Sequence, residues 1–441
     1  MKVIALGRRA GWGLADQAFS SLTNFAVGLL IARTVGPEDF GAFSLAFALY
    51  AVALNVSRAL TTQPLVIRHT GPATPEWRQA TTAASGTALL VGVVAGLIVL
   101  FVALFTGGAV RDAFLVMGLL MPGLLLQDAW RFAFFSSGRG GHACANDLAW
   151  AVVQLPTMVL ITFTGHASLV LGMVAWGGAA AVAAVLGVLQ AGLVPDPRRA
   201  IEWWQANRDL SARYVVEVAT GMGGAQISLY AVTAIAGLAA VGTLRAGELL
   251  LGPLNVLFQG IQLAALPEGV RLLRGSTAAL RRLSVLLSAV VASAVLLWGT
   301  FVWLIPESIG VAVLGATWGP AHSVLIPLAI GLAASAANMG ATVGLRALAA
   351  ARRSMNTNLV VTAIAISGNS LGAATRGALG AATGQAIATI VGSVVWWRQY
   401  VHALSQYAEE SHRASTEAED RRPDREAPLS VPGSPAPRSS K

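Results

Sequence analysis

Apolar stretches long enough to cross a bilayer recur along almost the whole of this 441-residue chain and end only at Tyr400. A membrane-spanning helix needs about 20 mainly apolar residues. Charged residues make up only 12% of the chain, whereas soluble proteins carry about 25%. Glycine and proline inside several stretches do not argue against helices, because helices packed together in a bilayer satisfy the freed backbone groups. We therefore expect an all-α integral membrane protein.

The apolar stretches predict twelve spans. The first six are residues 14–34, 40–60, 81–105, 111–136, 144–165 and 167–193. The second six are residues 213–235, 239–265, 281–305, 321–345, 356–374 and 378–400. The first span contains Asn24 and runs straight into the second, so we expect a retained helix and no cleaved signal.

Two connecting segments set the predicted domain boundaries. Residues 194–212 carry Trp203 and Trp204 with flanking arginines, which is typical of a short helix at the membrane interface. Residues 401–441 are rich in proline, serine and charge, which predicts disorder. The expected units are an N-lobe of six spans at 1–193, a cytoplasmic interfacial linker at 194–212, a C-lobe of six spans at 213–400 and a disordered cytoplasmic tail at 401–441.

The basic residues predict the orientation. With a cytoplasmic N-terminus, only four of the 30 basic residues fall outside, namely Arg33, Arg111, Arg245 and Arg376. Cytoplasmic loops carry an excess of Lys and Arg, so both termini are expected inside a multi-pass protein of the plasma membrane. The net charge of +9 then reflects loops that face anionic lipid headgroups, and it does not indicate nucleic-acid binding.

The two halves of the chain resemble each other. Sliding the sequence by 201 positions places Asp16 on Glu217, Gly36 on Gly237 and Gly41 on Gly242, each within apolar surroundings. An even number of spans per half gives both halves the same orientation, related by an axis along the membrane normal. The predicted fold is therefore twelve transmembrane helices in two pseudo-symmetric six-helix lobes around a central cavity, which each side of the membrane reaches in turn.

The segment LLIARTVGPEDFGAFSLA, residues 29–46, predicts a tight external hairpin between the first two spans. Arg33 lies in the last turn of the first helix, where a cation complements the helix dipole. Gly36 ends that helix and Pro37 suits the first position of the next. Glu38 and Asp39 then favour its first turn.

The same segment, extended to Leu49, resembles the first-hairpin signature of the polysaccharide-export branch of the MOP (multidrug/oligosaccharidyl-lipid/polysaccharide) flippase superfamily. The resemblance continues in AVGTLRAGELLLGPLNVLFQGI at 240–261 and IGVAVLGATWGPAHSVLIPLAIG at 309–331, and in the turns SSGRGGHACAND and AAARRSMNTN. It covers residues 10–400. It implies a two-lobed exporter, of the O-antigen type, that flips polyprenyl-diphosphate-linked oligosaccharide across the plasma membrane by alternating access. Coupling to H⁺ or Na⁺, contact with membrane lipids and a monomeric state are expected with it.

Two closely spaced pairs of charged residues lie within predicted spans, where each charge costs at least about 2.5 kcal/mol near the membrane centre. Asp128 and Arg131 are three residues apart in the fourth span, and Arg245 and Glu248 repeat this spacing in the eighth. Each pair could neutralise itself on one helix face. Two interpretations stay open: ion pairs that tie helices together, or side chains that line a wet cavity.

A guanidinium group matches the oxygens of a diphosphate with paired donors. The basic residues nearest the expected cavity are the candidate diphosphate ligands: Arg33, Arg245, Arg58 and Arg131. Buried carboxylates suit ion coupling, because burial disfavours their charged form. The candidates are Asp128, Glu248, Asp16 and Glu217, although Asp16 and Glu217 could equally be favourable acids at helix starts.

Amide side chains within the spans could contact the sugar: Asn24, Asn55, Asn255 and Gln259. Such residues also hydrogen-bond between helices in membranes, which is the alternative interpretation. Few polar residues interrupt the spans after residue 280.

Enzyme signatures are missing from the sequence. It has no Gly-x-x-x-x-Gly-Lys phosphate loop, and its six histidines show no metal-binding spacing. The single cysteine excludes an internal disulfide, and no cofactor or metal is expected. Two alternatives to the flippase remain: a cation-coupled drug antiporter of the same superfamily, and a polyprenyl-dependent glycosyltransferase using Glu38 and Asp39. An antiporter should have an acidic cavity, a diphosphate flippase a net positive one.

Overall fold

The computed structural model describes residues 22–420 apart from 24, 255–257, 259–260, 262–264, 266–267, 274–275 and 349. Helices form the described part, which contains no strand. A short apolar helix, Phe25–Thr34, precedes the elements of the first half: α2 (Pro37–Leu60), α3 (Thr62–Arg68), α4 (Pro75–Ala103), α5 (Gly108–Ser136), α6 (Gly140–Phe163) and α7 (Leu169–Ala191). The second half comprises η1 (Pro197–Arg199), α8 (Ala200–Leu251), α10 (Thr277–Trp303), α11 (Glu307–Leu314), η2 (Gly315–Thr317), α12 (Trp318–Ala337), α13 (Met339–Ala347) and α14 (Ala351–Asp420).

The described helices account for most of the twelve predicted spans. Nine are long and apolar enough to cross a membrane. Two of these nine are broken: α8 leaves helical geometry at Gly237, and α14 does so at Arg376 and Gly377. Counting each arm separately gives eleven apolar helical segments within the described residues, and Phe25–Thr34 is a shorter apolar helix that precedes them.

Two segments differ from their prediction. The interfacial helix does not stand alone, because α8 continues from Ala200 directly into the seventh span. Its start is held on the first half, where the indole Nε1 of Trp203 donates to the carbonyl of Leu60 at 2.9 Å. Residues 401–420 continue α14 as helix where disorder was predicted, and residues 421–441 lie outside the described part.

The predicted break between the first helix and the next is confirmed. Gly36 is the N-cap of α2, and Pro37, Glu38 and Asp39 lie in its first turn. Gly237, the counterpart of Gly36 in the second half, has φ 82°, in the left-handed region where glycine is favoured. Both glycines therefore end one helix and begin the next.

The two halves touch at the next pair of repeat-related glycines. A Cβ on Gly41 would lie 2.1 Å from the carbonyl oxygen of Leu238, and a Cβ on Gly242 would lie 1.7 Å from that of Pro37. Both distances are far below any real contact, so α2 and the second arm of α8 pack backbone against backbone. Only glycine allows this approach.

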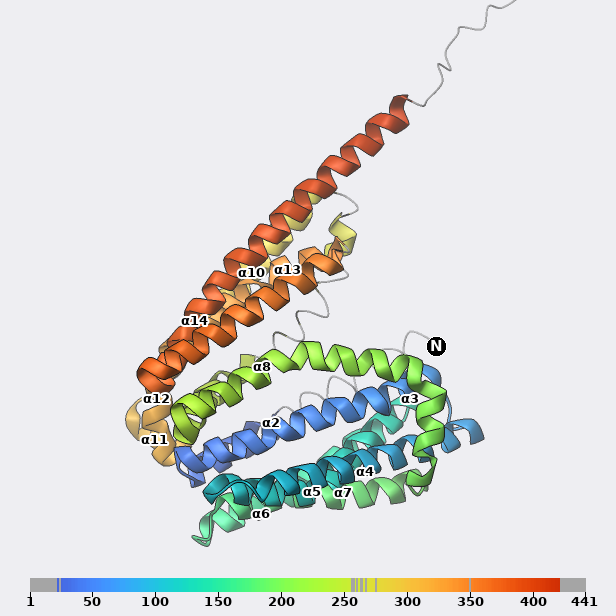
Figure 1. Cartoon of the computed structure of the whole chain (residues 1–441), viewed down its shortest axis with the longest axis vertical. Coiled ribbons are helices and arrows are strands. Elements are labelled where there is room, and N and C mark those ends of the chain that lie inside the picture. Colours follow the sequence, from blue (N-terminus) through green and yellow to red (C-terminus); the bar gives the residue numbers. More distant parts are fainter. Residues whose placement is uncertain are drawn as a thin grey trace, which may run out of the picture.

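A second contact joins the halves at the same end of the bundle. The hydroxyl of Thr317 in η2 donates to the carbonyls of Ala32 at 2.8 Å and Val35 at 3.1 Å. Next to it, the backbone of Gly315 lies against the carbonyl oxygen of Arg33. We call this end, formed by residues 31–41, 237–242 and 315–317, the closed end. From it, α13 and α14 diverge from the block that contains α2 to α7 (Figure 1).

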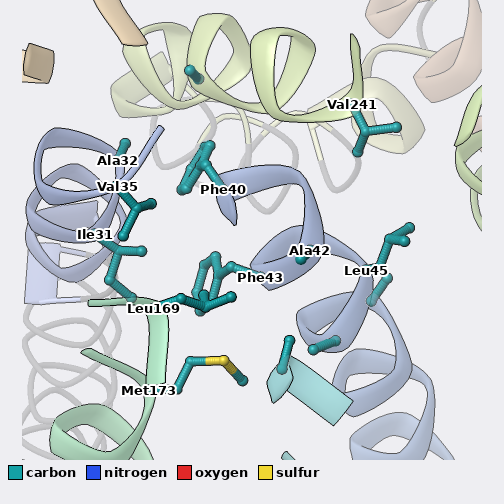
Figure 2. Packing of buried hydrophobic residues seen from close by; sticks show 14 of the residues in the cluster. Ile31, Ala32, Val35, Phe40, Ala42, Phe43, Leu45, Leu169, Met173 and Val241 are labelled. Atoms are coloured by element: carbon teal, nitrogen blue, oxygen red, sulfur yellow. The ribbon is translucent and has the colours of Figure 1, made fainter. Parts of the chain in front are cut away.

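The apolar core of the closed end is continuous between the halves. Figure 2 shows side chains from the first helix, α2 and α7 turned towards one another, with Val241 of α8 near α2. Its labelled members are fully or almost fully buried: Ile31, Ala32, Val35, Phe40, Ala42, Phe43, Leu45, Leu169, Met173 and Val241. Burial of this apolar surface holds the closed end together.

Candidate functional site

A cavity of about 1090 Å³ lies among α8, α12, α13 and α14. We expected a cavity between the lobes, whereas all described residues that line this one belong to the second half, between positions 224 and 396. Its polar and charged lining residues are Ser228, Arg245, Glu248, Ser335, Asn338, Thr342, Arg346, Ser354, Asn358, Thr362, Asn369, Gln385 and Thr389.

Two of the predicted site residues meet in this cavity. The guanidinium of Arg245 donates to the carboxylate of Glu248 at 2.8 Å, as the spacing of three residues predicted. Arg245 follows the break at Gly237 by eight residues, which places it about 12 Å along the helix from that break. The side chain of Arg245 is 38% exposed and that of Glu248 is 48% exposed, so the pair faces the open cavity.

The third charged lining residue, Arg346, was not predicted. It lies in the last turn of α13, is exposed, and makes no ion pair with any residue that the structure describes. The predicted tenth span ended at residue 345, so Arg346 was assigned to a cytoplasmic loop. With Arg245, Arg346 and Glu248 as its charged members, the described lining carries a formal charge of +1.

A row of small polar side chains lines the cavity along the first arm of α14. Ser354, Asn358, Thr362 and Asn369 recur at intervals of four or seven residues, which places them on one helical face. The amide of Asn369 donates to the hydroxyl of Ser228 on α8 at 2.6 Å and so joins two walls of the cavity. The spacing of these four residues by four or seven positions is the signal in the sequence that could have revealed the row. It was missed because only the scarcity of polar residues after residue 280 was considered.

A second polar cluster lies in the first half, and its pairing corrects the sequence analysis. Asp128 of α5 does not rely on Arg131 of its own helix but accepts two hydrogen bonds from Arg58 of α2, at 2.9 and 2.6 Å. The guanidinium of Arg58 also lies over the ring of Phe132, 5.1 Å from its centroid. The aspartate side chain is only 8% exposed, so this is an ion pair between helices.

Arg131 also pairs across helices. One of its nitrogens lies 3.3 Å from the carboxylate of Asp147 on α6, which in turn accepts a hydrogen bond from Gln127 at 2.8 Å. Asn146 extends the cluster to α7 by donating to Gln190 at 3.0 Å. Asp147 was missed because the predicted span began at residue 144. In the structure α6 begins at Gly140, so Asp147 lies within the second turn.

Three of the remaining candidates lie within the described residues, outside the lining of the cavity and the hydrogen bonds of the first-half cluster. Arg33 is exposed in the helix at the closed end, and Glu217 is exposed on α8. Asn55 donates to the carbonyl of Ala51 in its own helix at 2.8 Å. The other four, Asp16, Asn24, Asn255 and Gln259, lie outside the described residues.

The four predicted arginines therefore lie in three places and form no single anion site: Arg33 at the closed end, Arg58 and Arg131 in the first-half cluster, and Arg245 in the cavity. Among the described residues, no group of three or more His, Cys, Asp or Glu side chains could hold a metal ion.

No family model and no curated protein sequence matches the chain. Several solved structures do match it. An inward-facing multidrug resistance MATE family transporter of the MOP superfamily has a TM-score of 0.64 at 14% identity, over 88% of this chain and 96% of that one. The lipid II flippase MurJ, in an inward closed conformation, has a TM-score of 0.64 at 12% identity, over 88% of this chain and 89% of that one. A Vibrio cholerae MATE transporter has a TM-score of 0.50 at 17% identity, over 91% of this chain and 97% of that one.

At these identities the likeness concerns the fold. Each of these proteins is a helical membrane transporter or flippase, and the match spans nearly the whole of both chains. The chain is thus a multi-pass, all-helical membrane protein with the two-lobed fold that these transporters share.

Proposed function

We propose that the chain flips a polyprenyl-diphosphate-linked oligosaccharide from the cytoplasmic to the outer leaflet of the plasma membrane by alternating access. The observation that carries this proposal is the cavity among α8, α12, α13 and α14, whose described charged lining consists of two arginines and one glutamate. A diphosphate bears two or more negative charges, so a net positive chamber attracts it. The shared fold with a lipid flippase agrees with this activity.

Two arginines would hold the diphosphate at successive depths. Arg346 makes no described ion pair and is free to bind an anion at the α13 side of the cavity. Arg245, deeper along α8, would exchange Glu248 for phosphate. Because that pair is well exposed, breaking it costs no more than about 1 kcal/mol. The row of hydroxyl and amide groups on α14 would meet the sugar hydroxyls.

The first-half cluster is our candidate for ion coupling. Arg58 and Arg131 are matched by Asp128 and Asp147, so the cluster is formally neutral and held between helices. Proton or sodium uptake by Asp128 would weaken its bond to Arg58 and free α2 to move relative to α5. Glu248 is a second candidate, because it loses its partner when phosphate binds Arg245.

A cation-coupled drug antiporter is the second candidate, and the multidrug transporters with the same fold favour it. A net positive cavity lining opposes it, because cationic drugs would be repelled. The glycosyltransferase is the third. Glu38 and Asp39 lie in the first turn of α2, a position that acidic residues favour for electrostatic reasons alone.

The proposal is tested with purified protein in vesicles that contain a polyprenyl-diphosphate oligosaccharide. Transport is the share of sugar that becomes accessible to an added lectin on the far side. Arg346→Gln should lower the rate at limiting substrate about tenfold or more, the worth of a charge-assisted bond of about 1.5–3 kcal/mol. The control Arg352→Gln removes an exposed arginine of α14 that does not line the cavity, and should retain the rate.

In cells, Arg245→Ala should abolish surface polysaccharide without loss of folded protein, and deletion of the gene should leave lipid-linked oligosaccharide in the cytoplasmic leaflet. Equal rates for Arg346→Gln and Arg352→Gln would remove the cavity from the mechanism. Uptake of a cationic dye such as ethidium by the same vesicles, with no movement of oligosaccharide, would establish the antiporter instead.

A further inference from the structure

The two arms of α14 form an apolar groove on the face opposite the cavity. The groove has a volume of about 760 Å³ and runs along both arms between residues 363 and 391. Asn369 and Gln385 face the cavity, while their neighbours Gly368 and Gly384 line the groove. The groove is therefore a separate feature, and it does not open into the proposed transport site.

Close packing of the arms makes the floor of the groove. A Cβ on Gly384 would lie 2.0 Å from the carbonyl oxygen of Gly368, so the two backbones touch there. Leu371 and Ile387 form walls and are 70% and 59% exposed. The hydroxyl of Thr383 is already used within its own helix, where it donates to Leu379. Thr375 likewise donates to the carbonyl of Gly372 at 2.8 Å, so an apolar chain in the groove would leave both threonine hydroxyls paired.

One charged residue lines the groove, at the turn between the arms. Arg376 has φ −140° and ψ 27°, outside helical geometry, and Gly377 follows with φ 56° in the left-handed region. Arg376 is exposed, and it makes no ion pair with any residue in the described ranges. A phosphate group is the chemical complement of such a free guanidinium.

The dimensions select a lipid that occupies one leaflet. From Arg376 to residue 363 the first arm advances 13 residues, or about 20 Å at the rise of an α-helix. One leaflet contributes about 15 Å, half of the hydrocarbon thickness of a bilayer. A tilted groove of this length thus matches a single acyl chain, with its headgroup at the turn.

We propose that this groove is a binding site for an anionic phospholipid, one acyl chain lying along the glycine floor and the headgroup phosphate on Arg376. The site belongs to the leaflet on the side of the α14 turn, which the distribution of basic residues predicts to be the outer one. It does not depend on the proposed transport activity. Bound lipid would brace the two arms, which also form a wall of the cavity.

The test is native mass spectrometry of the purified full-length protein titrated with phosphatidylglycerol and, separately, with phosphatidylcholine. Arg376→Gln should weaken the first phosphatidylglycerol site about fivefold, the equivalent of about 1 kcal/mol per arginine at a membrane surface. Its affinity for phosphatidylcholine should stay the same. Arg111→Gln is the matched control, because Arg111 is exposed in the first turn of α5 and does not line the groove.

A second variant tests the acyl chain. Ser367→Trp places a large side chain at an exposed position in the groove and should reduce the retention of both lipids. The control Leu297→Trp, at a 73% exposed position on α10, should not change the retention of either lipid. Equal phosphatidylglycerol affinity for Arg376→Gln and Arg111→Gln would overturn the site, as would unchanged retention in Ser367→Trp. A dimer mass that disappears in Ser367→Trp would assign the groove to a second copy of the chain and also overturn it.

Discussion

Replacing Gly242 with alanine should force the closed end apart. The added Cβ would lie 1.7 Å from the carbonyl oxygen of Pro37, and ordinary contact begins at 3.4 Å, so the helices must separate by 1.7 Å where they cross. The opposing atom belongs to backbone and cannot turn aside. The strain is confined to the state in which α2 and α8 touch, and an open state would escape it.

The size of the effect follows from the cost of overpacking, which is about 1–3 kcal/mol. If the closed and open states differ by only a few kcal/mol, as two-state transporters do, this cost raises the open population about 5- to 150-fold. The change should appear without loss of folded protein, because the apolar core within each half is not altered.

The assay is labelling of a cysteine introduced at the closed end, and only one native cysteine has to be removed for it. Cys144→Ser gives a background without cysteine, and Val35→Cys then places a reporter at the closed end, where the native side chain is 6% exposed. Reaction with a membrane-impermeant maleimide should accelerate at least about fivefold when Gly242→Ala is added. The control is Gly223→Ala on the same helix, where an added Cβ meets nothing within 4 Å. Labelling rates within twofold of each other would refute the backbone contact as the closing element.

Three further predictions concern the two halves. Asp128→Leu leaves Arg58 charged and unpaired and should cost about 3 kcal/mol of unfolding free energy in micelles, whereas adding Arg58→Met should recover most of it. Thr317→Val removes a donor shared by two carbonyls and should raise reporter labelling about fivefold, for about 1 kcal/mol of hydrogen bonding. Gly86→Ala puts a Cβ 2.2 Å from the backbone of Asp196 and should lower the melting temperature, through overpacking of about 1–3 kcal/mol.

Each of these has an outcome that contradicts it. A double variant at Asp128 and Arg58 as unstable as the sum of the two single variants would show that the two side chains are not paired. Unchanged labelling in Thr317→Val would mean that η2 does not hold the closed end. A melting temperature for Gly86→Ala equal to that of Gly178→Ala, whose new Cβ would touch only Val174 at 4.0 Å, would refute the close approach of Asp196.

Much of the fold could be read from the sequence because its signals are local. Hydropathy over about 20 residues predicts a span whatever its neighbours are. The break at Gly36 followed by Pro37, and the pairing of Arg245 with Glu248, involve residues close together in the chain, and the structure confirms both. The break at Gly237 falls in the connection predicted between the spans at 213–235 and 239–265.

The partners of buried charges could not be read in the same way. Asp128 has Arg131 on its own helix within three residues, yet its bonds go to Arg58, which is 70 positions away. The choice depends on which face of α5 meets α2. The same holds for Asp147, whose role follows from where α6 begins and from its contact with α5.

By itself, the sequence determined that the chain crosses a membrane many times and where its helices break, because each of these properties belongs to a short segment. Only the tertiary structure decided that the cavity lies within the second half, that Arg346 shares it with Arg245, and that Gly41 and Gly242 hold the halves in contact. Those features depend on how helices far apart in the chain are packed, and a packing interface has no signature within a single helix.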